Sequence, residues 1–377
     1  MSDSARGRLA TRFARVAIVH EWLTVPGGSE NVVLAMLELF PQAELFTSVY
    51  DPAPWPARLR DRPVHASFLD RIPGARRHYQ RLLPLMNAAF ESFDLSGFDL
   101  VISSSHACAK NVLTGPLTPH ICYCHTPMRY AWDPSFLAGE RLGPAGRAAA
   151  TALLPRLRRQ DALAASRPDT YLANSRYVAA RIAKFYRREA TVLHPPVAVD
   201  ALLETPRAPE DYYLCFGRLV PYKRVDLAIA ACRRLGRRLK VAGAGREAAR
   251  LRALAGGGVE FLGRVPDADV PALLAGARAL LFPGEEDFGV VPVEAQAAGT
   301  PVIAYGVGGV RDSVVDGATG LFFAEQSADA LADAIRRFEA RRWEPAIARA
   351  NARAFAPERF HAGLARAVER LAAAMDA

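Results

Sequence analysis

Two carboxylates, Glu286 and Glu294, stand eight positions apart in the C-terminal half of this 377-residue chain. Glu286 follows a short apolar run, residues 279–282, which predicts a buried parallel strand. Glu294 falls within a predicted helix over residues 291–298. In open α/β sheets, ligands bind beyond the carboxyl ends of the strands. Two carboxylates at such an edge would accept hydrogen bonds from hydroxyl groups.

The residues between these carboxylates predict an anion site. The backbone amides of Phe288, Gly289 and Val290 open the predicted helix, and a helix N-terminus attracts phosphate. Sugar nucleotides carry both kinds of group, because a diphosphate lies between two hydroxyl-bearing sugars. The alternative is that both glutamates are solvated, since the helix dipole favours acidic residues near a helix start.

A second segment supplies cations. A predicted strand over residues 212–216 ends in a turn at Gly217, and Arg218 and Lys223 follow it. Arginine binds phosphate through its planar fork, and lysine adds a compact charge. We expect both to project from the strand end toward a ligand. The alternative is two surface cations.

The N-terminal half has two weaker candidates. Gly27 and Gly28 lie in a glycine-rich loop after a predicted strand at residues 16–20, where a phosphate or an acceptor could approach. His125 follows a predicted buried strand, residues 119–123, and could bind a sugar hydroxyl or stabilise a developing charge. A lone histidine is more often structural, and the glycine loop could be an ordinary one. The glycine-rich turns at residues 243–245 and 305–312 likewise leave ligand binding and tight turning as equal alternatives.

Strands and helices alternate twice along the chain. The pattern predicts two parallel α/β domains of Rossmann-like type, residues 1–200 and 201–377, facing across a cleft. A proline-rich linker covers residues 195–209. An amphipathic helix within residues 357–377 is expected to pack back on the N-terminal domain.

The net charge of +9 allows three kinds of partner: nucleic acid, an anionic membrane surface or a polyanionic substrate. No nucleic-acid motif is visible, so we expect no nucleic acid partner. Residues 76–90 and 146–159 combine basic and apolar side chains and could lie on an anionic bilayer. Each could equally be a core-facing helix, and an arginine-rich composition alone could explain the charge.

Composition also limits the compartment. No apolar run approaches the roughly 18 residues of a membrane-spanning helix, and no signal peptide is apparent. The five cysteines lack metal-ligand spacing. A reduced, cytoplasmic protein without a metal site is therefore expected.

Taken together, these segments resemble the retaining, nucleotide-sugar-dependent glycosyltransferases of the GT-B fold, in particular the bacterial mannosyl- and glucosyltransferase group. The resemblance runs from about residue 16 to the C-terminal helix. Its motifs are the Glu286/Glu294 pair, the segment from Gly217 to Lys223, and residues 298–304. Residues 125–133 resemble the mannosyltransferases that build lipopolysaccharide O-antigen or exopolysaccharide.

The resemblance implies a role for each residue. Arg218 and Lys223 would neutralise the donor diphosphate and replace a metal. Glu294 would accept from the ribose, and Glu286 from the transferred sugar. The remaining donor contacts would come from Gly217, from Phe288, Gly289 and Val290, from His125 near the reacting carbon, and from Gly27 and Gly28. Arg224 departs from the family, which often has glycine there.

The implied function is metal-independent, retaining transfer of a hexose, mannose from GDP-mannose, to a lipid-linked saccharide in lipopolysaccharide or exopolysaccharide synthesis. No cofactor is implied beyond this donor. The protein would work in the cytoplasm, peripherally on the inner membrane. Alternatives are a glucosyl-, galactosyl- or rhamnosyltransferase with a UDP or dTDP donor, a sugar-nucleotide epimerase on the same scaffold, and a basic membrane- or nucleic-acid-binding protein. The residues do not distinguish guanine from uracil.

Overall fold

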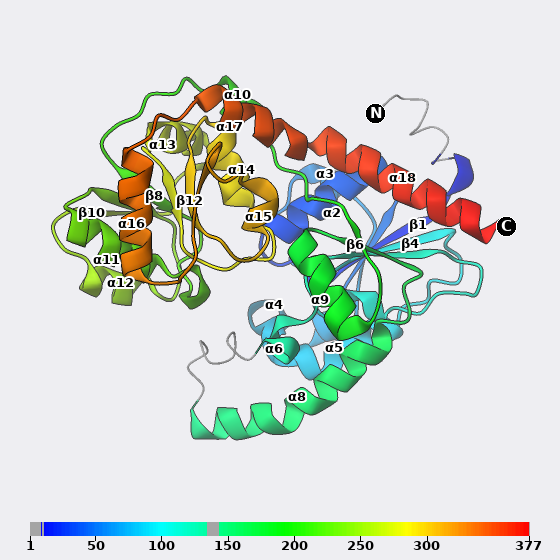
Figure 1. Ribbon diagram of the computed structural model, residues 1–377. Helices are drawn as coiled ribbons and strands as arrows, with labels where there is room; N and C mark the ends of the chain where they lie inside the picture. The colour runs from blue at the N-terminus through cyan, green and yellow to red at the C-terminus, as the bar shows by residue number, and fades with distance from the viewer. Residues whose placement is uncertain (1–8, 10, 134–142, 377) are drawn as a thin grey trace. The chain divides into compact units, whose positions relative to one another are not determined.

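The computed structural model describes residues 9, 11–133 and 143–376, and the chain forms two compact units (Figure 1). The N-terminal unit comprises Met1–Pro196 and Glu358–Ala377, and the C-terminal unit comprises Val197–Pro357. The boundary thus lies at 196/197, where we predicted 200/201.

The N-terminal unit is built on a seven-stranded sheet in the order β3-β2-β1-β4-β5-β6-β7, with every pair parallel. The central strands are buried along their whole length because helices cover both faces. The strands are β1 Val16–His20, β2 Glu44–Thr47, β3 Val64–Ala66, β4 Leu100–Ser105, β5 His120–Cys124, β6 Thr170–Ala173 and β7 Thr191–Val192. The chain leaves β1 in opposite directions toward β2 and β4, so the ends of β1 and β4 form the switch point where ligands bind in such sheets.

The helices of this unit include one from the far end of the chain. Helix α18, Pro357–Met375, packs Phe360, Leu364 and Val368 into the same core as β1 and α2. The others are α2 Gly28–Leu39, α3 Ala57–Arg60, α4 Ala75–His78, α5 Leu83–Glu91, α6 Arg129–Trp132, α8 Pro144–Ala164 and α9 Arg176–Tyr186, with the 3-10 turns η1 Phe68–Arg71, η2 Tyr79–Leu82 and η3 Ala109–Asn111. The basic segment 76–90 is therefore α4, η2 and α5 in succession, not one helix.

The C-terminal unit has a six-stranded parallel sheet in the order β10-β9-β8-β11-β12-β13. Its strands are β8 Tyr213–Phe216, β9 Leu239–Ala242, β10 Val259–Gly263, β11 Leu280–Phe282, β12 Val302–Tyr305 and β13 Gly320–Phe323. Neighbouring residues of β8 enter opposite cores, Leu214 on one face and Cys215 on the other. The predicted fold class, two Rossmann-like parallel-sheet domains, is confirmed.

The helices of the C-terminal unit cover both of these cores. They are α10 Asp200–Glu204, α11 Val225–Leu235, α12 Ala248–Leu254, α13 Val270–Gly276, α14 Val290–Ala297, α15 Val310–Ser313, α16 Ala328–Glu339 and α17 Pro345–Ala352, with η4 Pro221–Lys223, η5 Asp267–Asp269 and η6 Arg353–Phe355. Across the described part of both units, no helix is both long and apolar enough to cross a bilayer.

Candidate active site

The predicted site residues divide between the two units. The C-terminal unit carries Gly217, Arg218, Lys223, Glu286, Phe288, Gly289, Val290 and Glu294, and the N-terminal unit carries Gly27, Gly28 and His125. Each group lies at the carboxyl ends of central strands of its own sheet, as the motif positions predicted.

A small cavity lies beyond the ends of β8 and β11. Gly217, Arg218, Lys223 and Glu286 are among its lining residues. Lys223 Nζ lies 2.6 Å from Glu286 Oε1, and the two side chains are only 14% and 18% exposed. Burial would lower the pKa of Lys223, but the Glu286 carboxylate raises it above its ordinary value, so the lysine is charged. The predicted cation and the predicted hydroxyl acceptor thus form one ion pair.

Glycines bring the strand-end loops of this unit into backbone contact. Gly217 has φ +132°, and a Cβ at Gly243, also at φ +132°, would lie 1.9 Å from the Gly217 carbonyl oxygen. A Cβ at Gly284 would lie 2.8 Å from Lys223 Cα. The turn at residues 243–245 therefore has a structural role, because it packs against the Gly217 loop.

Arg218 lies at the exposed tip of this loop. Its guanidinium donates to the Tyr222 hydroxyl at 3.3 Å. An exposed arginine at the rim of the cavity suits a group that closes on a phosphate when ligand arrives.

Arg224 has a left-handed backbone, with φ +49°. Its side chain is held by both carboxylate oxygens of Asp226, at 3.2 Å each, and by Gln326 Oε1 at 3.3 Å. Glycine adopts this conformation without steric cost, which explains physically why glycine suits the position. Arg224 therefore keeps the left-handed backbone conformation that glycine would adopt here and adds an ion pair with Asp226.

We expect Arg224→Gly to change the free energy of unfolding by less than about 1 kcal/mol, because relief of the left-handed strain offsets the lost pair with Asp226. Arg224→Val loses the same pair and adds a β-branched residue at positive φ, so it should destabilise by about 2 kcal/mol or more. Urea denaturation of the two variants checks this. A glycine variant as unstable as the valine variant would contradict the backbone explanation.

The start of α14 contributes its backbone. Gly289, at φ +85°, precedes the helix, and Val290 is its first residue. The Phe288 side chain is buried and lies 5.7 Å from the Phe355 ring, so only its main chain is available to a ligand. The Gly309 amide donates to the Glu286 carbonyl at 2.8 Å. The glycine-rich turn at residues 305–312 therefore supports the Glu286 segment by packing.

Glu294, within α14, has a perturbed carboxyl group. Burial raises its pKa to about 7, against the opposing charge of Lys223. At neutral pH the carboxyl is therefore divided between its protonated and ionised forms. Because only the ionised form has both oxygens free to accept from a pair of vicinal hydroxyls, ligand binding and proton release should be linked.

We expect the affinity for a nucleotide-sugar donor to rise about tenfold between pH 6 and pH 8 and then to level, because the ionised fraction of a group with pKa 7 rises by that factor. The proton should be released on binding, which calorimetry in buffers of different ionisation enthalpy measures. Glu294→Gln should bind more weakly at pH 8 and lose this dependence. A pH slope that survives in Glu294→Gln would assign it to another group.

In the N-terminal unit, His125 lies at the end of β5. Ser104 Oγ is 2.8 Å from His125 Nε2 and 3.1 Å from His20 Nδ1, so one hydroxyl joins two imidazoles. Asn174 Nδ2 donates to the His125 carbonyl at 2.9 Å. Burial, together with the charges of His106 and His20, holds the pKa of His125 well below its usual range. His125 is therefore a neutral imidazole.

Gly27 and Gly28 are exposed at the start of α2. Glu30, in the first turn, is buried, and its Oε1 lies 3.3 Å from His20 Nε2. Burial would raise the pKa of Glu30, but His20 lowers it below its ordinary value. A Cβ at Gly27 would lie 2.8 Å from Glu30 Oε2. An internal carboxylate thus lies beside the loop where a phosphate was predicted to approach.

The sequence analysis missed the polar residues at the ends of β1 and β4. They are His20, Glu21, Ser104, Ser105 and His106, and Glu30 in the first turn of α2 pairs with His20. A usable signal was present, because the apolar runs of both strands end in polar side chains at buried positions. Across the described residues, no group of three histidine, cysteine or acidic side chains is placed to hold a metal ion.

Two family models match consecutive parts of the chain. Residues 26–201 match Glycosyltransferase Family 4, and residues 204–355 match Glycosyl transferases group 1. A GDP-mannose-dependent phosphatidylinositol monomannoside mannosyltransferase of Corynebacterium glutamicum is 33% identical over 195 residues, 44% of this chain and 50% of that protein. Glycogen synthase of Mycobacterium tuberculosis is 36% identical over 162 residues, 40% of this chain and 38% of that protein. The chain thus spans half or less of these curated relatives.

Solved structures agree over nearly the whole chain. Sucrose-phosphate synthase of Thermosynechococcus elongatus has a TM-score of 0.70 at 20% identity, covering 96% of this chain and 99% of that one. Anabaena HepE in complex with UDP has a TM-score of 0.66 at 17% identity, covering 96% and 100%. At these identities the likeness shows the fold, which is GT-B. On this fold, each half of the chain matches a glycosyltransferase family model, and residues 204–355 match that of the group 1 glycosyltransferases.

Proposed function

We propose that this protein is a metal-independent, retaining hexosyltransferase that uses GDP-mannose and a lipid-linked saccharide acceptor. The observation that carries the proposal is the partly buried Lys223–Glu286 pair in a cavity rimmed by Arg218. A charged lysine, an exposed arginine and a carboxylate at one strand edge suit a diphosphate joined to a sugar.

Each group has a part in the transfer. Lys223 and Arg218 hold the diphosphate and stabilise the charge that develops on it as its bond to the anomeric carbon breaks. The acceptor oxygen forms the new bond to that carbon, and its proton passes to the departing diphosphate oxygen. Glu286 accepts from hydroxyls of the transferred sugar, Glu294 accepts from the ribose, and neutral His125 binds near the reacting carbon.

Mannose and a lipid acceptor rest on the relatives. The curated proteins that match include GDP-mannose-dependent phosphatidylinositol monomannoside mannosyltransferases of Corynebacterium glutamicum and Mycolicibacterium smegmatis. We extend their donor class, and a lipid-linked acceptor in lipopolysaccharide or exopolysaccharide synthesis, to this chain.

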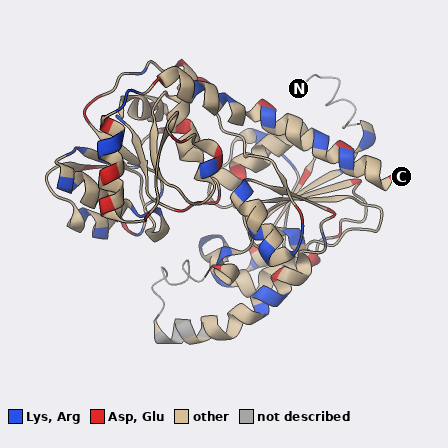
Figure 2. Ribbon diagram, viewed as in Figure 1, with Lys and Arg blue, Asp and Glu red and all other residues tan. Residues whose placement is uncertain are grey.

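A surface of the N-terminal unit supports work at a membrane. Phe68, Ile72 and Leu85 are 43%, 36% and 47% exposed on η1, its C-terminal flank and α5. In the sequence, four exposed basic residues lie between them, namely Arg71, Arg76, Arg77 and Arg81. Figure 2 shows further basic residues on α8 and α9. Apolar side chains among cations suit the cytoplasmic, anionic face of the inner membrane.

Vesicles that contain phosphatidylglycerol should therefore bind the protein. Vesicles of phosphatidylcholine alone should not.

The test is a donor screen with purified protein, GDP-, UDP- and dTDP-sugars and EDTA. Release of free nucleotide is followed with and without a bacterial lipid extract. Release from GDP-mannose that needs lipid, and that is lost in Glu286→Ala and Arg218→Ala, supports the whole proposal.

Other outcomes correct parts of it. Release from a UDP- or dTDP-sugar replaces mannose and keeps the enzyme class. Release only after a divalent metal replaces EDTA overturns metal independence. Change of the donor sugar into its epimer without an acceptor indicates the epimerase. If no nucleotide is released with any donor or metal, the proposed transferase function is overturned.

A further inference from the structure

A buried carboxylate holds the loop that follows β4. Glu21 is completely buried and accepts hydrogen bonds from the four successive amides of residues 106–109, at 2.7–3.0 Å. The Ser105 hydroxyl donates to it at 3.0 Å. Burial would raise the pKa of Glu21, but the charge of His106 and these amides lower it. The loop is thus fixed around an ionised side chain.

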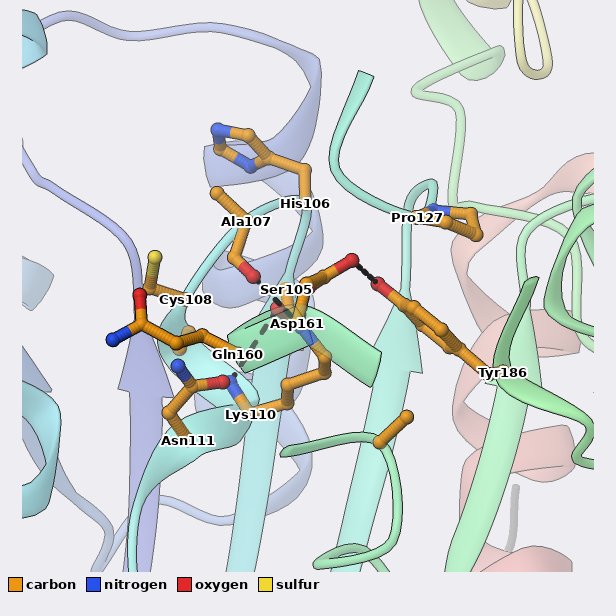
Figure 3. A network of polar contacts seen from close by, with 12 residues as sticks. Ser105, His106, Ala107, Cys108, Lys110, Asn111, Pro127, Gln160, Asp161 and Tyr186 are labelled. Atoms are coloured by element: carbon orange, nitrogen blue, oxygen red, sulfur yellow. Dashed lines mark hydrogen bonds and ion pairs between the residues drawn. The ribbon is translucent and has the colours of Figure 1, made fainter. Parts of the chain in front are cut away.

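A second buried pair also holds this loop. Lys110 Nζ donates to the Ala107 carbonyl at 2.8 Å and pairs with Asp161 (Figure 3). Asp161 also accepts from the Trp132 indole at 2.6 Å and the Tyr186 hydroxyl at 2.9 Å. Burying so many charged groups costs desolvation free energy. Buried charges of this kind usually serve a functional site rather than stability.

The two sets of contacts leave one side chain of the loop partly exposed. Within residues 103–111, all described, His106 alone is not buried. The serines of this stretch are committed, Ser103 to His120 and Ser104 to two imidazoles. Figure 3 shows the His106 ring pointing away from the Lys110–Asp161 contacts. The loop therefore presents an imidazole from a rigid base.

The surroundings of His106 indicate what it can bind. Its ring centroid lies 6.2 Å from those of His125 and His20, and 4.8 Å from Trp22, edge to face. Among the described residues, the charged and titratable groups near it include the carboxylates of Glu21 and Glu30 and the imidazoles of His20 and His125. Two carboxylates disfavour a phosphate here, whereas a hydroxyl group carries no charge and can pair with an imidazole.

We propose that His106 is a substrate-contacting residue that hydrogen-bonds a sugar hydroxyl beside His125, and that Glu21 is its positioning residue. The inference rests on the proposed transferase function. The hydroxyl can belong to the donor sugar or to the acceptor sugar, and these two sources are separable by kinetics.

The variants are chosen to separate contact from packing. His106→Phe keeps a ring against Trp22 and removes the hydrogen bond. His120→Asn is the matched control, a buried histidine on β5 bonded to Ser103, away from this loop. Glu21→Gln keeps the shape but sets an amide donor against the amides of residues 106–109, and Ser105→Ala removes one donor as a milder change.

The measurements use full-length protein, GDP-mannose and lipid extract, with GDP affinity and melting temperature recorded for each variant. We expect His106→Phe to lower kcat/KM at least 30-fold, with GDP affinity unchanged within twofold. Glu21→Gln or Ser105→Ala should also lower kcat/KM. If His106→Phe loses activity in the hydrolysis of GDP-mannose without acceptor, the hydroxyl belongs to the donor sugar. If it loses activity only in transfer, the hydroxyl belongs to the acceptor sugar.

If kcat/KM of His106→Phe is within threefold of wild type, or is no lower than that of His120→Asn, the proposed contact with the sugar hydroxyl is overturned. Full activity in both Glu21→Gln and Ser105→Ala overturns the positioning role. If the wild-type protein turns over no donor, the proposed transferase function fails on its own. Quenching of Trp22 fluorescence by titrated methyl α-mannoside then decides whether His106 contacts a sugar hydroxyl. A sugar-dependent change lost in His106→Phe supports it, and no change overturns it.

Discussion

Lys223→Met is expected to lower kcat for transfer by about 10³-fold, because it removes the charge that stabilises the departing diphosphate. It also leaves Glu286 without the cation 2.6 Å away, so the remaining carboxylate would repel the donor. The affinity for GDP should fall as well. Steady-state kinetics with the donor identified by the screen measure both effects.

Lys240→Met is the matched control for this prediction. Lys240 belongs to β9 of the same unit and pairs with Glu210 at 3.6 Å, but does not line the cavity. It should leave kcat within about twofold, since most surface pairs contribute little. Equal losses in the two variants would show that the net charge of the unit, rather than Lys223, matters.

Asp161→Asn should destabilise the N-terminal unit by about 3–5 kcal/mol, because it leaves Lys110 buried and charged without its partner. The melting temperature of this unit should fall by about 10 °C. Differential scanning calorimetry measures the change, and the transition of the C-terminal unit serves as an internal reference.

Tyr186→Phe tests whether charge is the cause. It removes one hydrogen bond to Asp161 but keeps the Lys110 pair, so it should cost only about 1 kcal/mol. Lys110→Met with Asp161→Leu removes both charges and should recover much of the loss. A double variant as unstable as Asp161→Asn would show that packing dominates.

The fold was predictable because each domain repeats buried strands with helices between them. β5 has an apolar run at residues 121–124 and is buried along its whole length. The segment at residues 76–90 was harder, because its mixed basic and apolar pattern has no single period, and the structure breaks it at His78 and again at Leu82.

The candidate site was predictable where glycine and charge follow a strand within a few residues. Gly217, Lys223 and Glu286 come together for this reason. Glu21 and Asp161 were not found, since their partners lie about 85 and 51 positions away in the chain. Short-range pattern does not reveal such pairs.

The glycine contacts in the C-terminal unit bear on any effort to change the donor by laboratory evolution. Gly217, Gly243 and Gly284 hold three loops at backbone distance, and any side chain at Gly243 or Gly284 would collide with main-chain atoms. Randomising these positions would fill a library with misfolded members. Diversity is better placed at half-buried Tyr222, whose hydroxyl accepts from Arg218, because a new side chain there leaves both the arginine and the loop spacing intact.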